Sequence, residues 1–117
     1  AESEPETQAI TAFIEEIDPR SLYAFHSQGE EIFYRYGNRT PDRARLMGEI
    51  LATTSGYTLC DPEGMASHGG LKDWFIERYG RPGFTFEIGK GKNPLPVSDL
   101  IPIYERLRET LVLGIIL

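Results

Sequence analysis

The sequence predicts an α/β layered fold, because helical patterns and short β-prone runs alternate along its 117 residues. Helices are expected at residues 3–18, 41–55 and 71–79, and again from residue 98 onwards. Strands are expected at residues 22–25, 31–36, 57–59 and 84–88. The length fits one domain or part of one, and neither repeats nor low-complexity linkers divide it.

The first predicted helix has clear signals at both ends. Ser3 and Glu6 form a capping box, and Pro5 lies in the first turn. Asp18, which precedes a proline, ends the helix. Apolar residues at helical spacing form one stripe, namely Ile10, Phe13, Ile14 and Ile17.

The next three elements are two extended segments and a helix. Residues 22–25 predict a buried strand, and residues 31–36 predict a second extended segment after a turn at Gln28 and Gly29. The helix that follows is expected to have Thr40 as its N-cap, Pro41 at its first position and Gly56 just beyond its end. Its core face is expected to consist of Ala44, Met47, Ile50 and Leu51.

The second half of the sequence continues the alternation. A short extended piece at 57–59 is followed by a loop at 61–64, and the helix at 71–79 has Gly80 as its natural C-cap. The strand at 84–88 leads into a loop at 89–94. Ser98 is expected to cap the last helix, whose apolar stripe is Leu100, Ile103, Leu107, Leu111 and Ile115.

Composition limits the classes of function. The formal net charge of −6, without a basic cluster, argues against nucleic acid or an anionic membrane surface as a partner. The single cysteine, Cys60, excludes an intrachain disulfide framework and a zinc site built from several thiolates. The last apolar segment, at 111–117, is shorter than the roughly 20 residues that cross a bilayer. We therefore expect no nucleic acid and no membrane among the partners, and the sequence predicts no compartment.

Two predicted strands end in side chains that can perform chemistry. His26 follows the run at 22–25, and Glu87 follows the aromatic run at 84–86. A histidine can bind zinc, and a glutamate can take a proton from the water that attacks a substrate. The simpler alternatives are an imidazole that bonds only to nearby backbone and a carboxylate that faces water. Two further zinc ligands are needed, and this sequence does not supply them.

The sequence resembles the C-terminal half of the zinc carboxypeptidase family, the carboxypeptidase A-like peptidases. Among these it is most similar to the bacterial γ-D-glutamyl-L-diamino acid endopeptidases, which cut the stem peptide of peptidoglycan. The motifs that carry the resemblance keep the family's order and spacing over nearly the whole chain: Ser3-Glu4-Pro5-Glu6, His26-Ser27-Gln28-Gly29-Glu30, Gly69-Gly70-Leu71-Lys72-Asp73-Trp74-Phe75 and Pro82-Gly83-Phe84-Thr85-Phe86-Glu87.

The resemblance implies a partial peptidase domain at residues 1–117, with a mixed sheet flanked by helices. The family's His-x-x-Glu zinc motif belongs to the N-terminal half and is absent, since His68 is followed by Gly69. The resemblance also implies that His26 is the family's third zinc ligand and Glu87 the general base. The implied cofactor is Zn²⁺, with an incomplete site in this chain.

Four further residues become candidates for substrate binding through the same resemblance. Lys72 matches the floor of the pocket for the residue after the cut bond, where a cation would favour a negatively charged side chain such as that of meso-diaminopimelate. The alternative is an ordinary surface lysine. Gln28 and Glu30 could line the cleft, or Glu30 and Glu31 could form a solvated turn. Met65 falls where classical members carry a mobile tyrosine, and its thioether cannot donate that hydrogen bond.

Two hypotheses of different classes follow. The chain is either the C-terminal portion of a zinc peptidase that hydrolyses γ-D-glutamyl-diamino acid bonds in peptidoglycan-derived peptides, or a catalytically inactive structural or interaction module. Under the first hypothesis the 117-residue chain alone is expected to be inactive. Half of a larger sheet would leave an edge in water, so self-association through that edge is also expected.

Overall fold

The computed structural model describes residues 4–61 and 70–117, which build one mixed four-stranded sheet in the order β1-β4-β2-β3. The strands are β1 (Leu22–His26), β2 (Glu31–Phe33), β3 (Thr58–Cys60) and β4 (Gly83–Glu87). β1 runs parallel to β4 and β2 parallel to β3, whereas β2 and β4 are antiparallel. The predicted α/β class is therefore confirmed, and the sheet is mixed as the resemblance implied.

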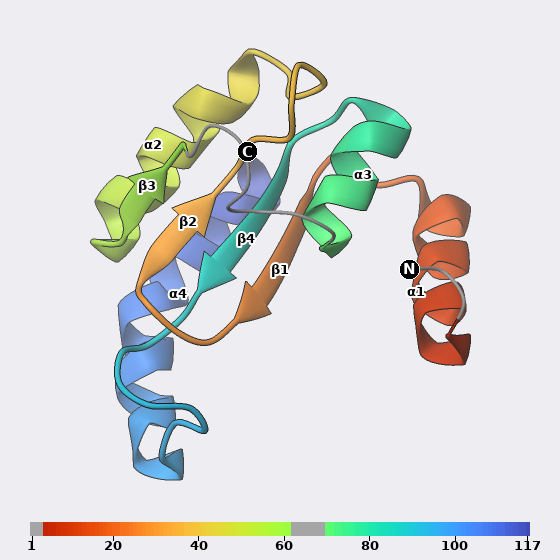
Figure 1. The fold of residues 1–117 in the computed structure, drawn as a ribbon. Helices are drawn as coiled ribbons and strands as arrows, with labels where there is room; N and C mark the ends of the chain where they lie inside the picture. Colours follow the sequence, from red (N-terminus) through yellow and green to blue (C-terminus); the bar gives the residue numbers. More distant parts are fainter. Residues whose placement is uncertain (1–3, 62–69) are drawn as a thin grey trace.

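Helices cover both faces of this sheet (Figure 1). α2 (Arg43–Ser55) and α4 (Leu100–Ile116) lie on one face. α3 (Leu71–Tyr79) lies on the other, with α1 (Pro5–Ile17) beside it. A 3-10 turn, Val97–Asp99, leads into α4. The molecule thus has a three-layer arrangement, which is how α/β folds bury both sheet faces.

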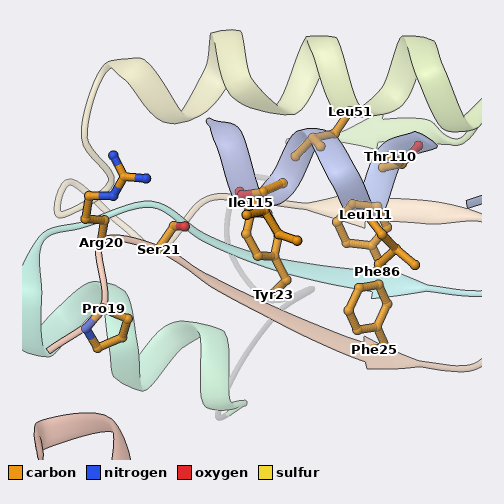
Figure 2. Close-up of a pocket in the computed structure, with 11 residues that line it drawn as sticks. Pro19, Arg20, Ser21, Tyr23, Phe25, Leu51, Phe86, Thr110, Leu111 and Ile115 are labelled. Atoms are coloured by element: carbon orange, nitrogen blue, oxygen red, sulfur yellow. The ribbon is translucent and has the colours of Figure 1, made fainter. Parts of the chain in front are cut away.

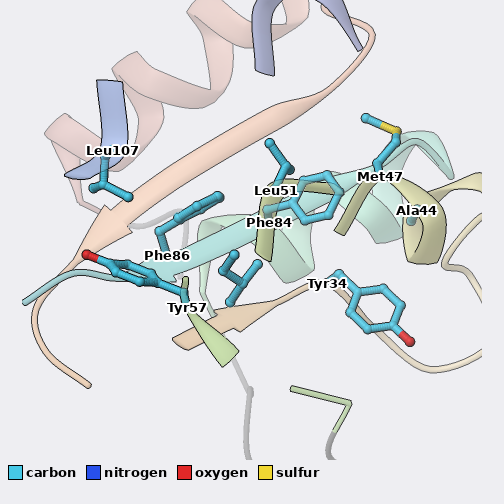
Figure 3. Packing of buried hydrophobic residues seen from close by; sticks show 9 residues of the cluster. Tyr34, Ala44, Met47, Leu51, Tyr57, Phe84, Phe86 and Leu107 are labelled. Atoms are coloured by element: carbon cyan, nitrogen blue, oxygen red, sulfur yellow. The ribbon is translucent and has the colours of Figure 1, made fainter. Parts of the chain in front are cut away.

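The larger core lies between the sheet and the layer of α2 and α4 (Figure 3). β4 supplies Phe84 and Phe86, which alternate along the strand and are buried on the same face. Ile32 of β2 is fully buried beside them. The remaining members of this cluster are Tyr34, Ala44, Met47, Leu51, Tyr57 and Leu107.

A smaller core lies on the opposite face, under α3. It joins Ile14 of α1, Leu22 of β1 and Phe75 of α3. α3 approaches β4 closely, because a Cβ built on Gly83 would lie 3.1 Å from Cγ1 of Ile76. This face is the one that carries the side chains of the candidate site.

Helix boundaries agree with the sequence patterns at most ends. α3 has the predicted bounds, and Gly80 ends it in the left-handed conformation with φ 62°. α2 begins at Arg43 rather than at Pro41, and α4 begins at Leu100 after the 3-10 turn. The Thr40 hydroxyl does not cap α2, because it accepts a hydrogen bond from the Tyr36 amide at 2.6 Å. The N-cap of α1 is Glu4, whose side chain makes no capping hydrogen bond, so the predicted position of the cap at Ser3 was wrong; Ser3 itself lies outside the described residues.

Several apolar residues that the patterns predict as core are exposed instead. In α1 only Ile14 of the stripe is buried, while Ile10, Phe13 and Ile17 are about half exposed. In α4 Leu100 and Ile115 are exposed, and in α2 Ile50 is only partly buried. The buried strand predicted at 22–25 is also wrong at its end, because Phe25 is 43% exposed. β1 forms the outer edge of the sheet, so no described strand covers its far side.

Among residues 4–61 and 70–117, no helix is long and apolar enough to cross a membrane.

Candidate active site

His26 and Glu87 are neighbours across the parallel pair β1–β4. They are Cα partners in the register of that pair, at the carboxyl end of both strands. Side chains in register point to the same face, and adjacent strands lie about 4.8 Å apart. His26 is exposed and Glu87 is half-buried, so both groups can be reached by solvent. The structure thus places the two side chains together, at the kind of strand end where α/β proteins bind ligands.

Hydrogen bonds tie the segment after β1 to the segment after β4. The Ile88 amide donates to the His26 carbonyl at 2.6 Å, and the Gly29 amide donates to the Gly89 carbonyl at 2.7 Å. Farther along, the Ser27 hydroxyl donates to Oδ1 of Asn93 at 2.7 Å, and Asn93 Nδ2 donates to the Ser27 carbonyl at 3.2 Å. The turn that carries Gln28 is therefore held against the loop that follows Glu87.

A third side chain extends this pair into a row. Glu31 opens β2 and is the Cα partner of Glu87 in the antiparallel pair β2–β4. Glu31 is half-buried, and the thiol of Cys60 donates to its Oε2 at 3.6 Å. His26, Glu87 and Glu31 therefore occupy one face of three adjacent strands. The sequence analysis placed Glu31 at the start of an extended segment, with a solvated turn as the alternative, and did not assign it to the site, because the strand register that makes it a neighbour of Glu87 leaves no local signal.

Cys60 is not a reactive thiolate in this setting. Burial raises the pKa of its thiol, and the charge of Glu31 raises it further. The thiolate is the nucleophilic form of cysteine, so a raised pKa leaves the group as a neutral hydrogen-bond donor near neutral pH.

Lys72 is buried rather than solvated. Its side chain is 2% exposed, and Nζ donates to Asp73 Oδ1 at 2.6 Å and to the Arg35 carbonyl at 2.7 Å. The surface-lysine alternative is therefore wrong. Its role in substrate binding stays a prediction, and Asp73 is a partner that the sequence analysis did not identify.

Arg35 also contacts the residue that follows β3. Its guanidinium forms an ion pair with Asp61, which includes a bond from Nη2 to Oδ2 at 3.1 Å. The hydrogen bond from Arg35 lowers the pKa of the Asp61 carboxyl. Met65 and His68 lie outside the described residues, so the substrate contact expected of Met65 stays a prediction.

Gln28 and Glu30 lie in different surroundings. Gln28 is exposed, as a residue that lines a cleft would be. Glu30 accepts a hydrogen bond at its Oε2 from Arg106 Nη1 at 2.9 Å, and Lys90 Nζ lies 3.8 Å from its Oε1. Glu30 is thus paired with cations on neighbouring segments rather than part of a freely solvated turn.

The apolar pocket shown in Figure 2 is on the other face of the sheet. It has a volume of about 430 Å³, and β1 lines it with Tyr23 and Phe25, whereas His26 belongs to the opposite side of the same strand. Leu111 and Ile115 of α4 complete its wall. This pocket does not include the row of His26, Glu87 and Glu31.

Among the described residues, His26 can supply one ligand of a zinc site. The His26 imidazole is a common zinc donor and is exposed at a strand end. Within residues 4–61 and 70–117, however, no three His, Cys, Asp or Glu side chains gather in a metal-binding group. A complete site would therefore need ligands from beyond the described residues.

Comparison with known proteins at the level of sequence identifies one family. The family model described as zinc carboxypeptidase matches residues 1–110. The chain is 35% identical over 116 residues to γ-D-glutamyl-L-diamino acid endopeptidase 1 of Lysinibacillus sphaericus. It is 37% identical over 102 residues to the uncharacterized protein YqgT of Bacillus subtilis (strain 168). These matches cover 98% and 87% of the chain but only 28% and 27% of the two relatives.

Two solved structures have a similar fold. Thrombin-activatable fibrinolysis inhibitor superposes with a TM-score of 0.78 at 19% identity, over 96% of this chain and 33% of that one. Murein-tripeptide amidase MpaA from Escherichia coli O157 superposes with a TM-score of 0.65 at 24% identity, over 95% and 41% respectively. At these identities the two structures support the fold alone.

Proposed function

The chain belongs to the zinc carboxypeptidase family, and from this premise we propose that it is the C-terminal part of a peptidase that hydrolyses γ-D-glutamyl-diamino acid bonds in peptidoglycan stem peptides. The observation that carries the proposal is the register of His26 with Glu87 across β1 and β4. A metal-binding imidazole and a carboxylate base on adjacent strands are two of the groups that hydrolysis of an amide at a zinc site uses. The bond to be cut is suggested by the name of the Lysinibacillus relative.

The proposed domain is a partial one, because the chain spans less than a third of the curated relatives that it matches. On this proposal the chain is part of a longer polypeptide, called the full-length protein below, whose other residues complete the metal site. His26 would hold zinc through one ring nitrogen. When bound, zinc supplies Lewis acidity, which polarises a carbonyl and makes water more acidic.

The position of Glu87 supports its proposed role as the general base. Its carboxylate shares a sheet face with His26 and remains partly exposed, so the attacking water and the peptide can reach it. In this role it accepts a proton from the attacking water and then delivers a proton to the departing amine. The departing amine belongs to the diamino acid. The side chain of this diamino acid would extend along the same face of the sheet, toward α3 and Lys72.

The experiment that tests this function is an assay of the full-length protein on two matched peptides. One contains L-Ala-γ-D-Glu-meso-diaminopimelate, and the other has L-lysine in the last position. We expect hydrolysis of the γ-D-glutamyl bond, measured as release of the diamino acid, and loss of activity after zinc is removed with a chelator. Turnover of neither peptide by the zinc-loaded protein would contradict the proposal.

Lys72 gives the assay a specificity prediction. If its ammonium recognises the side-chain carboxylate of diaminopimelate, Lys72→Ala should lower kcat/KM for that peptide about 10-fold more than for the lysine peptide, since a hydrogen bond to a charged group is worth about 1.5–3 kcal/mol. The variant also removes the buried ion pair between Lys72 and Asp73, so it is expected to be less stable. The ratio of kcat/KM for the two peptides cancels the folded fraction, so an unchanged ratio would assign Lys72 a purely structural role.

Exposed apolar residues near β1 favour the self-association that is expected of half of a larger sheet. Phe25 on the edge strand, Phe13 on α1 and Ile115 on α4 are all exposed. Exposed strand edges and exposed apolar side chains favour contacts with other chains. We expect the 117-residue chain to form a dimer that buries about 1,000 Å² or more in total. Light scattering over a concentration series measures this, and a monomer at the highest concentration would contradict it.

A further inference from the structure

We infer that Arg106 is a positioning residue for the turn that joins His26 to Glu31, and that it acts through an ion pair with Glu30. The inference rests on the proposed function, because it assigns that turn to the active site. Arg106 lies on α4, 76 residues away from Glu30 in the sequence, and donates from Nη1 to Glu30 Oε2 at 2.9 Å. The Glu30 side chain is 18% exposed, so this ion pair is partly shielded from water.

The guanidinium of Arg106 is itself held by the end of α2. Its Nε donates to the Ser55 carbonyl at 2.8 Å, and its Nη2 donates to the Gly56 carbonyl at 3.2 Å. The last carbonyls of a helix lack partners within the helix, and a cation is favoured beside them. The guanidinium also lies over the Tyr57 ring at 5.2 Å. Arg106 is therefore oriented by the helical layer before it reaches Glu30.

Glu30 needs such a partner because of its backbone. Its φ is 55°, which is the left-handed region that residues with a side chain seldom adopt unless their surroundings hold them there. The Glu30 carbonyl accepts from the Thr58 amide at 3.0 Å, where β2 and β3 begin to pair. The neighbouring Gly29 amide donates to the Gly89 carbonyl at 2.7 Å. The side-chain ion pair thus secures the residue at which the chain reverses between β1 and β2.

Both ends of this turn carry groups of the candidate site. His26 is the last residue of β1 and Glu31 the first of β2, and both are in register with Glu87. The exposed Gln28 lies between them. If Glu30 leaves its left-handed conformation, the turn changes direction and the spacing of these groups changes with it. Displacements of about 1 Å in an active site can lower a rate by about 100-fold.

The test compares Arg106→Gln with Arg108→Gln in the full-length protein. Arg108 lies on the same helix, and its Nη1 is 3.4 Å from Oε2 of Glu105, in an exposed pair away from the turn. We expect Arg106→Gln to lower kcat/KM by about 10- to 100-fold, with the fall mainly in kcat and with bound zinc unchanged. Arg106→Lys should recover only part of the loss, because an ammonium cannot reproduce the fixed fork that reaches three acceptors. Arg108→Gln should match the unmodified protein.

A second readout does not depend on activity. Amide hydrogen exchange should accelerate at Gly29 and Thr58 in Arg106→Gln and remain unchanged there in Arg108→Gln. If Arg106→Gln unfolds the protein, Glu30→Ala decides, because it removes the ion pair and leaves the bonds from Arg106 to α2 in place. Glu30→Ala should then show the same local acceleration and the same fall in kcat.

The outcomes separate this inference from the proposed function. The positioning role would be overturned, whatever reaction the protein catalyses, if Arg106→Gln had the same hydrogen exchange and the same kcat/KM as the unmodified protein. If Arg106→Gln unfolds, the same result in Glu30→Ala would overturn it. Faster exchange at the turn with unchanged kcat/KM would overturn it also, because the turn would then not matter for catalysis. A full-length protein that hydrolyses neither peptide overturns the proposed function and, with it, the active-site assignment of the turn.

Discussion

Glu87→Gln should lower kcat of the full-length protein by about 100-fold or more, which is the contribution expected of a general base. Glutamine keeps the shape of the side chain on β4 but cannot accept a proton. Glu87 is not an expected zinc ligand, so the zinc content should stay at the level of the unmodified protein. The measurement is single-turnover hydrolysis of the diaminopimelate peptide, with bound zinc determined on the same sample.

A matched control is Glu77→Gln, which makes the same change at an exposed position of α3. It should leave kcat unchanged. Near-normal turnover of Glu87→Gln with zinc in place would remove Glu87 from the mechanism.

Phe84→Ala should have the largest effect on stability. Phe84 is fully buried in β4, which has a strand on either side, and its ring stacks on Tyr23 with centroids 5.3 Å apart. Replacing a buried phenylalanine by alanine costs about 3–5 kcal/mol. A typical domain is stabilised by only about 5–15 kcal/mol, so this loss is a large part of the total. Urea unfolding followed by circular dichroism measures the loss.

Phe13→Ala is the control for this change, because Phe13 on α1 is 59% exposed. Phe13→Ala should lower the free energy of unfolding by much less than Phe84→Ala does. Equal losses at the two positions would mean that the core does not lie between β4 and the layer of α2 and α4.

Local signals were sufficient to predict where most elements lie. The bounds of α3 follow from its apolar pattern and from Gly80, which can adopt the left-handed conformation at a helix end without strain. The start of α2 could not be predicted in the same way. Thr40 has the character of an N-cap, but its hydroxyl bonds to the amide of Tyr36, and the helix begins at Arg43, two residues later than predicted.

Periodicity predicted which residues share a helix face but not whether that face is covered. Ile10, Ile14 and Ile17 of α1 follow one stripe, yet only Ile14 contacts the sheet core. The spacing of apolar residues depends on the helix alone, whereas burial depends on what packs against it. Lys72 is the opposite case. Its sequence context is that of an ordinary lysine, yet its side chain is buried and forms an ion pair with Asp73.

The candidate site was predicted residue by residue, but its arrangement was not. His26 and Glu87 could be identified as strand ends and through the family resemblance. Their proximity comes from the pairing of β1 with β4, and the inclusion of Glu31 comes from the pairing of β4 with β2. Arg106 could not be found from the sequence, because it reaches Glu30 only through the packing of α4 beside the end of α2.

The most direct measurement for the central claim is the zinc content of the full-length protein carrying His26→Ala, compared with that carrying Glu87→Gln. If His26 on β1 binds the metal and Glu87 on β4 serves as the base, His26→Ala should lose zinc on dialysis while Glu87→Gln keeps about one zinc per molecule. Both proteins should retain the circular dichroism spectrum of the unmodified one. Zinc held by His26→Ala as tightly as by the unmodified protein would contradict the assignment of the metal to this strand end.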